Sequence, residues 1–246
     1  MAGSLLTRRE VLYLCGATGI SALFGSDTSS GENLIPAERA VDHILLGAAD
    51  LGSAIAWVER QTGVKAEPGG SHPGAGTRNA LISLGGRHYL EIIAPDPKQT
   101  AFNFQIDIQK LTEPRLITWA AATTDIEAVA KKARAAGYQI FGPRDGSRAR
   151  PDGNVLQWKT LGVMNKLGLE GVEPIPFFIQ WAAGSVHPSK DSPKGCELQS
   201  FEIGHPAREE ILAALKRLGI QAKVTQSTKI TITAALKTPK GRVELS

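Results

Sequence analysis

The sequence predicts an α+β fold in which two paired modules form a curved, cavity-enclosing mixed sheet, followed by a third C-terminal βαββ-type copy. Two observations predict it. An apolar strand, an amphipathic helix and further strands recur in the same order three times along the 246 residues, and each helix ends at a glycine that an apolar residue follows. Because such a unit cannot bury its sheet face alone, two copies must pair, and the third must pack on that pair or on another chain.

The first copy starts as an apolar strand and continues as a helix. Asp50 stands where an N-cap belongs, and Gly63 stands where the helix should end. The expected elements are a strand over 41–47, the helix between those two residues, a Gly- and Pro-rich loop over 68–76, and strands over 77–84 and 87–93.

The other two copies repeat this order. In the second copy, Thr124 or Asp125 caps the helix and Gly137 ends it, and in the third, Pro206 lies near the helix start and Gly219 ends it. Expected strands lie over 116–121, 155–161 and 176–181 in the second copy and over 197–203, 229–236 and 242–245 in the third. The predicted domains are 37–190 for the pair and 191–246 for the third copy. The odd number of modules favours a homodimer.

Composition and charge are those of a globular protein, with 42% hydrophobic residues, 21% charged residues and a net charge of +4. After the second helix, a loop rich in Arg, Gly and Pro is expected. Its basic residues are interpreted as solvated, with an anion-binding rim as the alternative; they are Arg144, Arg148, Arg150 and Lys159. No nucleic-acid-binding motif is present, so no nucleic acid partner is expected.

Residues 1–36 are interpreted as a leader and linker. Arg8 and Arg9 precede a mildly apolar run, which resembles a twin-arginine export signal, so we expect the protein to be exported; the alternative is a cytoplasmic protein with a disordered leader. No later segment contains about 18 consecutive apolar residues, so no stable membrane span is expected. The two cysteines, Cys15 and Cys196, form no metal-ligand pair.

Four stretches of the first copy together carry a family resemblance. They are Asp42-His43-Ile44-Leu45-Leu46, the helix after Asp50, the loop over 68–79, and Tyr89-Leu90-Glu91-Ile92-Ile93-Ala94-Pro95-Asp96-Pro97. Their order and spacing resemble the glyoxalase-like domain of the vicinal oxygen chelate superfamily over roughly residues 41–181. The resemblance implies paired βαβββ modules. It also implies an enzyme of the lyase, isomerase or dioxygenase type that acts on a small molecule.

In metal-dependent members of that superfamily, each half supplies one ligand from its first strand and one from its last, and the divalent ion chelates two neighbouring oxygens. The resemblance therefore implies His43 and Glu91 as ligands from the first half. In the second half, Trp119 and Gln180 fall at the matching positions. Since Trp cannot bind a metal, the expected ligand set is His43, Glu91 and Gln180, for Zn, Fe, Mn or Ni.

The residues themselves also indicate a site. A carboxylate between apolar neighbours on a strand must face a polar group, so Glu91 is the predicted catalytic base, with a salt bridge to Arg87 or Arg78 as the alternative. The predicted substrate contacts are Asn79, Trp119, Gln180 and Trp181.

The roles of three histidines remain open, and two alternative functions remain possible on the sequence alone. His43 could instead be a buried residue held by Asp42, His72 could lie on a surface loop or a lid, and His187 could replace a missing ligand. The alternative to an enzyme is a metal-free protein that binds or sequesters a small molecule in the same cavity. A structural module whose cavity is plugged by Trp119 is the third possibility.

Overall fold

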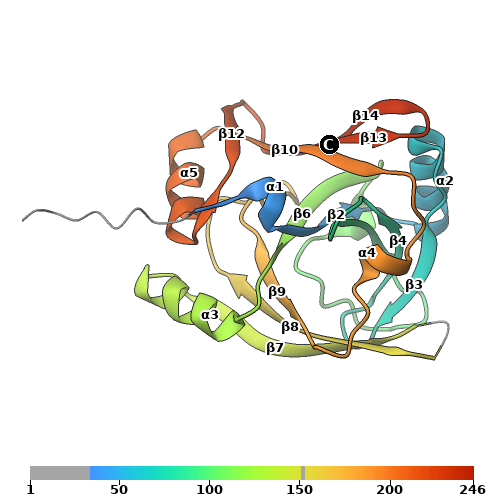
Figure 1. Ribbon diagram of the computed structural model, residues 1–246, viewed down its shortest axis with the longest axis horizontal. Coiled ribbons are helices and arrows are strands. Elements are labelled where there is room, and N and C mark those ends of the chain that lie inside the picture. Colours follow the sequence, from blue (N-terminus) through green and yellow to red (C-terminus); the bar gives the residue numbers. More distant parts are fainter. Residues whose placement is uncertain (1–33, 151–152) are drawn as a thin grey trace, which may run out of the picture. The chain divides into compact units, whose positions relative to one another are not determined.

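The computed structural model describes residues 34–150 and 153–246 (Figure 1). Most of the predicted leader, including both arginines and Cys15, therefore lies outside the described residues. Of its last positions, Ile35–Pro36 form strand β1, which pairs in parallel with β11 (Ile220–Gln221), and helix α1 (Ala37–Ala40) follows. No helix within the described ranges combines the length and apolar character needed to cross a membrane.

The two predicted modules form one mixed sheet of eight strands, in the order β3-β4-β5-β2-β6-β9-β8-β7. The first module comprises β2 (Val41–Gly47), α2 (Leu51–Thr62), β3 (Glu67–His72), β4 (Thr77–Ser83) and β5 (Tyr89–Pro95). The second comprises β6 (Arg115–Ala122), α3 (Ile126–Ala135), β7 (Ile140–Ala149), β8 (Val155–Val163) and β9 (Phe177–Trp181). In each module the first strand pairs in parallel with the last, and β2 joins the modules by pairing with β6. The predicted fold class is confirmed.

The third copy forms its own four-stranded sheet, in the order β12-β10-β13-β14. Its elements follow the expected order: β10 (Glu197–His205), α5 (Arg208–Arg217), β12 (Lys223–Gln226), β13 (Thr231–Thr238) and β14 (Gly241–Leu245). Here the first strand lies inside the sheet, between β12 and β13, whereas β2 and β6 each pair with the last strand of their module. The third copy thus shares the element order of the modules but arranges its strands differently. Two short helices, η1 (Ile108–Lys110) and α4 (Pro188–Asp191), lie in connections.

Helix boundaries follow the predicted local chemistry. The Asp50 side chain accepts a hydrogen bond from the Ser53 amide, and Gly63 takes a left-handed conformation with φ of 80° at the end of α2. In the second module Asp125, rather than Thr124, caps α3. The aspartate caps at the starts of α2 and α3, together with the positive-φ glycine after α2, fix where these two helices lie relative to the strands.

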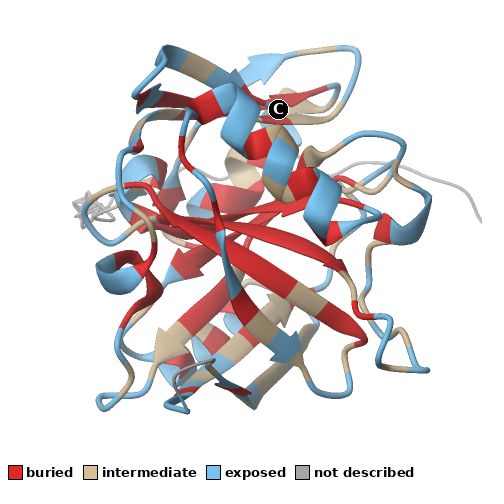
Figure 2. Ribbon diagram, turned by 90° about the vertical axis from the view of Figure 1, so that its right-hand side faces the viewer, coloured by how far each residue is buried: buried red, intermediate tan, exposed pale blue. Residues whose placement is uncertain are grey.

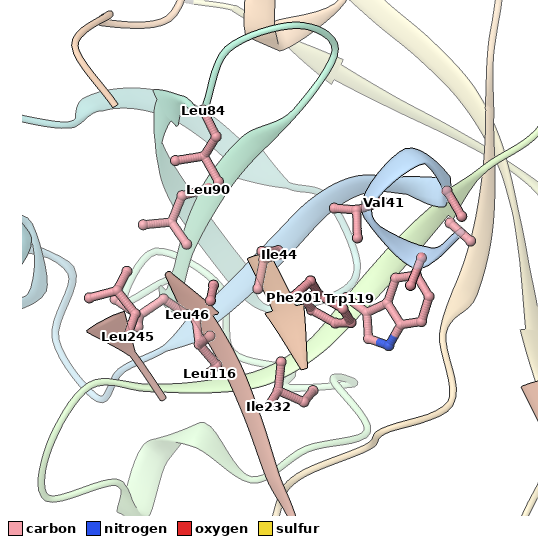
Figure 3. Packing of buried hydrophobic residues seen from close by; sticks show 14 of the residues in the cluster. Val41, Ile44, Leu46, Leu84, Leu90, Leu116, Trp119, Phe201, Ile232 and Leu245 are labelled. Carbon is pink, nitrogen blue, oxygen red and sulfur yellow. The ribbon is translucent and has the colours of Figure 1, made fainter. Parts of the chain in front are cut away.

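The core lies between the two sheets (Figures 2 and 3). One face of β2 and β6 meets the small sheet, and Trp119 packs against Phe201 with ring centroids 4.9 Å apart. The labelled core residues include Ile44, Leu46, Leu116, Ile232 and Leu245. Because the third copy buries its sheet face within the same chain, the pairing argument for a homodimer no longer applies.

Two segments that were expected to be loops are edge strands. Residues 67–72 form β3, and the Arg-rich segment forms β7, so Arg144 and Arg148 lie on a strand. Gly and Pro suit such positions because an edge strand has fewer hydrogen bonds to lose. These two strands are the opposite edges of the eight-stranded sheet, and they contact each other. The sheet is therefore curled until its edges meet, which encloses space on its concave side.

Candidate active site

The concave side of the eight-stranded sheet holds a cavity of about 470 Å³, lined from both modules. This volume lies within the range of small-molecule sites. Successive side chains on a strand face opposite sides, so His43 and Leu45 on β2 face the cavity while Ile44 and Leu46 face the core. One face of β2 thus lines the cavity, and its other face builds the hydrophobic core.

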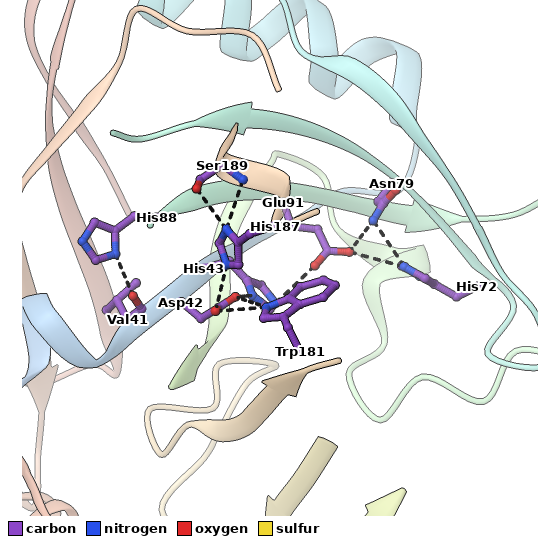
Figure 4. A network of polar contacts seen from close by, with 10 residues as sticks. All are labelled: Val41, Asp42, His43, His72, Asn79, His88, Glu91, Trp181, His187 and Ser189. Atoms are coloured by element: carbon purple, nitrogen blue, oxygen red, sulfur yellow. Dashed lines mark hydrogen bonds and ion pairs between the residues drawn. The ribbon is translucent and has the colours of Figure 1, made fainter. Parts of the chain in front are cut away.

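Glu91 lies in the wall of the cavity and is only 7% exposed. Its Oε1 accepts a hydrogen bond from Asn79 Nδ2 at 2.7 Å, and its Oε2 lies 3.3 Å from His43 Nε2 (Figure 4). Burial by itself raises the pKa of this carboxyl, but His72, His43 and the Asn79 hydrogen bond together outweigh burial and lower it. Glu91 is therefore a carboxylate at neutral pH, desolvated yet ready to accept a proton.

Asp42 holds the other side of His43. His43 Nδ1 lies 2.8 Å from Asp42 Oδ1, His187 Nε2 lies 3.0 Å from Oδ2, and Trp181 Nε1 donates to Oδ2 at 3.1 Å. Burial opposes ionisation of Asp42, but the hydrogen bonds from His187 and His43 win and hold its pKa well below the ordinary value. The predicted alternative for His43, a histidine held by Asp42, is thus realised together with a position in the cavity wall.

The contacts of His43 fix where a proton must sit. Because Nδ1 donates to the Asp42 carboxylate, Nε2 faces Glu91 Oε2. Two lone pairs at that separation would repel, so a proton between Nε2 and Oε2 stabilises this contact. The pair can therefore release or accept a proton without any rearrangement of the chain.

His72 ends β3 and lines the cavity, which corrects its interpretation as a surface-loop residue. Asn79 Nδ2 lies 3.2 Å from His72 Nε2, and Thr77 Oγ1 lies 2.9 Å from Nδ1. Since the amide can only donate, Nε2 accepts and the proton stays on Nδ1. Burial lowers the pKa of His72, which agrees with a neutral ring.

Gln180 does not join this cluster. Its neighbours Ile179 and Trp181 line the cavity, whereas the Gln180 side chain accepts the Ile126 amide at 2.8 Å at the start of α3. This placement corrects the expectation that Gln180 lies beside Glu91. Leu45 pairs with Glu91 across β2 and β5, and the matching pair across β6 and β9 is Ala122 with Ile179. The residue that corresponds to Glu91 is therefore Ile179, and Gln180 is offset from it by one residue, which turns its side chain to the other face.

Trp119 is also placed elsewhere. It is fully buried in the core between the sheets, and its Nε1 donates to the Pro174 carbonyl at 2.9 Å. Ala120, not Trp119, pairs with His43 across β2 and β6 and faces the same side. The expected substrate contact, and the idea of a Trp119 plug, are both corrected by this register. Asn79 and Trp181, the other predicted contacts, do line the cavity.

The four-ligand metal site of the resemblance does not fit these residues. The first module supplies His43 and Glu91, but the matching positions of the second module are Ala120 and Ile179, which have no donor atom. The oxygen of Gln180 is engaged with the α3 backbone. Across the described ranges, no group of three or more His, Cys, Asp or Glu side chains is placed to hold a metal ion. We therefore derive no step through a metal.

Paired βαβββ modules around a cavity with a buried carboxylate–histidine pair define the class of this protein. The family model described as "Glyoxalase-like domain" matches residues 41–219, so the chain belongs to the glyoxalase-like domain family. This confirms the resemblance predicted from the sequence. None of the curated proteins matches the chain.

Comparison with solved structures found several similar chains. A hypothetical protein from Staphylococcus aureus is 19% identical, with a TM-score of 0.59 over 83% of each chain. A methylmalonyl-CoA epimerase variant from Streptomyces coelicolor in complex with 2-nitronate-propionyl-CoA is 20% identical, with a TM-score of 0.43 over 58% of this chain and 98% of that one. The methylmalonyl-CoA epimerase from Mycobacterium tuberculosis is 20% identical, with a TM-score of 0.39 over 58% of this chain and 88% of that one.

Proposed function

We propose that this protein is a small-molecule enzyme of the lyase or isomerase type that moves a proton on a carbon next to a carbonyl group. One observation carries the proposal: the buried Glu91 carboxylate lies 3.3 Å from His43 Nε2 in the wall of a ligand-sized cavity. A base of this kind is held within reach of a bound substrate and is shielded from water.

In the proposed step, Glu91 Oε2 takes the proton from the carbon. The electrons of the broken C–H bond form a C=C bond, and the carbonyl oxygen receives a proton from His43 Nε2. Asp42 keeps His43 oriented through the contact with Nδ1, so that Nε2 faces Glu91. Return of a proton to either carbon gives an isomer, and loss of a group from the next carbon gives a lyase product. The acid and the base are the same pair of residues, so no external group is needed.

Deuterium incorporation tests this step. Small 2-oxo acids, hydroxyketones and acyl thioesters are incubated with the protein in D₂O, and exchange at the carbon next to the carbonyl is followed by NMR. We expect Glu91→Gln to slow exchange at least about a hundredfold, because the amide cannot accept the proton. Glu67→Gln, which removes an exposed carboxylate from β3, is the matched control. Equal rates for wild type and Glu91→Gln would contradict the proposal.

A metal-free binding protein is the second candidate. The observation that favours it is the packing surface that Phe177, Ile179 and Trp181 provide in the second module's part of the cavity wall. Compounds that bind in the cavity and never exchange a proton would support this candidate.

Export is also proposed, on the sequence of the leader alone. Conversion of Arg8 and Arg9 to lysine should leave the protein in the cytoplasm if the leader is a twin-arginine signal. Unchanged distribution between cell fractions would contradict export by this route.

A further inference from the structure

Arg148 has a position in the cavity wall that the proposed proton transfer does not use. It lies on β7, is only 4% exposed, and its Nη1 has no hydrogen-bond partner within the described part of the chain. Among the described residues that line the cavity, it is the one Arg or Lys side chain. A buried guanidinium nitrogen without a partner is costly unless something else accepts its N–H groups.

Within the described residues, no acidic side chain forms an ion pair with Arg148. Among acidic groups, Glu91 has the largest effect on the pKa of Arg148. Its oxygens, however, are engaged with Asn79 and His43 and lie near His72. Arginine stays protonated even where burial lowers its pKa, as it does here. The guanidinium therefore keeps its charge and has donors to offer to a bound molecule.

The neighbouring strand is built to leave room for this side chain. A Cβ on Gly69 would stand 2.7 Å from Arg148 Nη1 and 2.5 Å from Asn79 Oδ1, and a Cβ on Gly70 would stand 3.3 Å from the Arg148 stem. Asn79 Oδ1 is also buried, and it has no hydrogen-bond partner among the described residues. Two glycines in β3 thus let a charged side chain from the opposite edge of the sheet reach the cavity, next to a second unsatisfied polar atom.

We propose that the cavity binds a small organic carboxylate, whose carboxylate group pairs with Arg148 while its apolar part lies against Phe177 and Trp181. A planar carboxylate fits the guanidinium fork, and a single negative charge avoids strong repulsion by Glu91. The inference deepens the proposed function, because it names the class of substrate whose reacting carbon would face Glu91.

Calorimetric titration with two probes of the same shape tests the charge preference. The probes are 3-phenylpropionate and its neutral amide, 3-phenylpropionamide. We expect wild type to bind the carboxylate at least about tenfold more tightly, as charge-assisted hydrogen bonds to arginine imply. Arg148→Met should abolish the preference while leaving amide binding unchanged. Arg144→Met removes an exposed arginine from the same strand and should keep the preference.

A second variant guards against a folding defect. Arg148→Lys keeps the charge but loses the fork, so its preference should fall between wild type and Arg148→Met. Equal binding of both probes by wild type, no carboxylate binding at millimolar concentration, or a preference that survives in Arg148→Met would overturn the inference. Glu91→Gln separates this result from the proposed chemistry, because it should abolish exchange yet bind 3-phenylpropionate at least as tightly as wild type.

Discussion

Replacement of Asp42 by Asn should destabilise the fold through the hydrogen bonds that surround this carboxylate. Asp42 is 1% exposed and receives N–H donors from His43, His187 and Trp181. An Asn side chain has one oxygen, and its NH₂ group must then face a buried N–H. Hydrogen bonds to a charged group contribute about 1.5–3 kcal/mol each. Loss of one or two of them predicts a decrease of about 3 kcal/mol in the free energy of unfolding at pH 7.

The effect should depend on pH in a defined direction. The pKa of Asp42 in the folded protein lies below its ordinary value of 3.8 because hydrogen bonds from His187 and His43 overcome the effect of burial. A lowered folded pKa means that the stabilisation is fully present above the unfolded pKa and is lost as pH falls toward the folded pKa. The gap between wild type and Asp42→Asn should therefore be constant above about pH 5 and shrink below about pH 4.

Guanidinium unfolding curves at a series of pH values measure this gap. Asp125→Asn is the matched control, since Asp125 is exposed and Asn caps a helix about as well as Asp. A change of less than about 0.5 kcal/mol for Asp42→Asn at pH 7, the size of an ordinary surface substitution, would refute the reasoning. A gap that does not shrink in acid would refute the assignment of Asp42 as an ionised acceptor.

Three further substitutions separate core, cavity wall and helix cap, each measured by guanidinium unfolding and by titration with 3-phenylpropionate. Trp119→Phe leaves a buried carbonyl without its donor and should cost about 1–3 kcal/mol with binding unchanged; weaker binding would contradict its placement in the core. Gly69→Ala should cost about 1–3 kcal/mol and weaken binding, because the new methyl displaces Arg148; wild-type binding would count against that contact. Gln180→Ala removes an acceptor at the start of α3 and should cost about 0.5–2 kcal/mol with binding unchanged.

The residues of the candidate site were predictable to different degrees. His43 and Glu91 stand out in the sequence because a polar group inside an apolar strand demands a partner. Their companions Asp42 and His187 lie far apart in the chain, and only folding brings them within hydrogen-bond distance. The sequence leaves His187 open as a replacement metal ligand, whereas in the structure it donates a hydrogen bond to Asp42.

Trp119 and Gln180 show how a small error in register changes a site. The order of residues in the repeats matches Trp119 to His43 and Gln180 to Glu91, but each lies one residue away from the position that faces the cavity. Side chains alternate between the faces of a strand, so a shift of one residue exchanges core for cavity. A bulge in the pairing of β2 with β6 makes such a shift invisible in the sequence.

The sequence by itself determined the modules, because helix caps, glycine stops and the period of apolar residues are local properties of the chain. Tertiary structure alone decided which side chains line the cavity. Arg148 enters it only because the curled sheet brings β7 against β3, where Gly69 has no side chain. Burial, pairing and the protonation of Glu91 depend on groups that are distant in sequence, and electrostatic interactions act across space rather than along the chain.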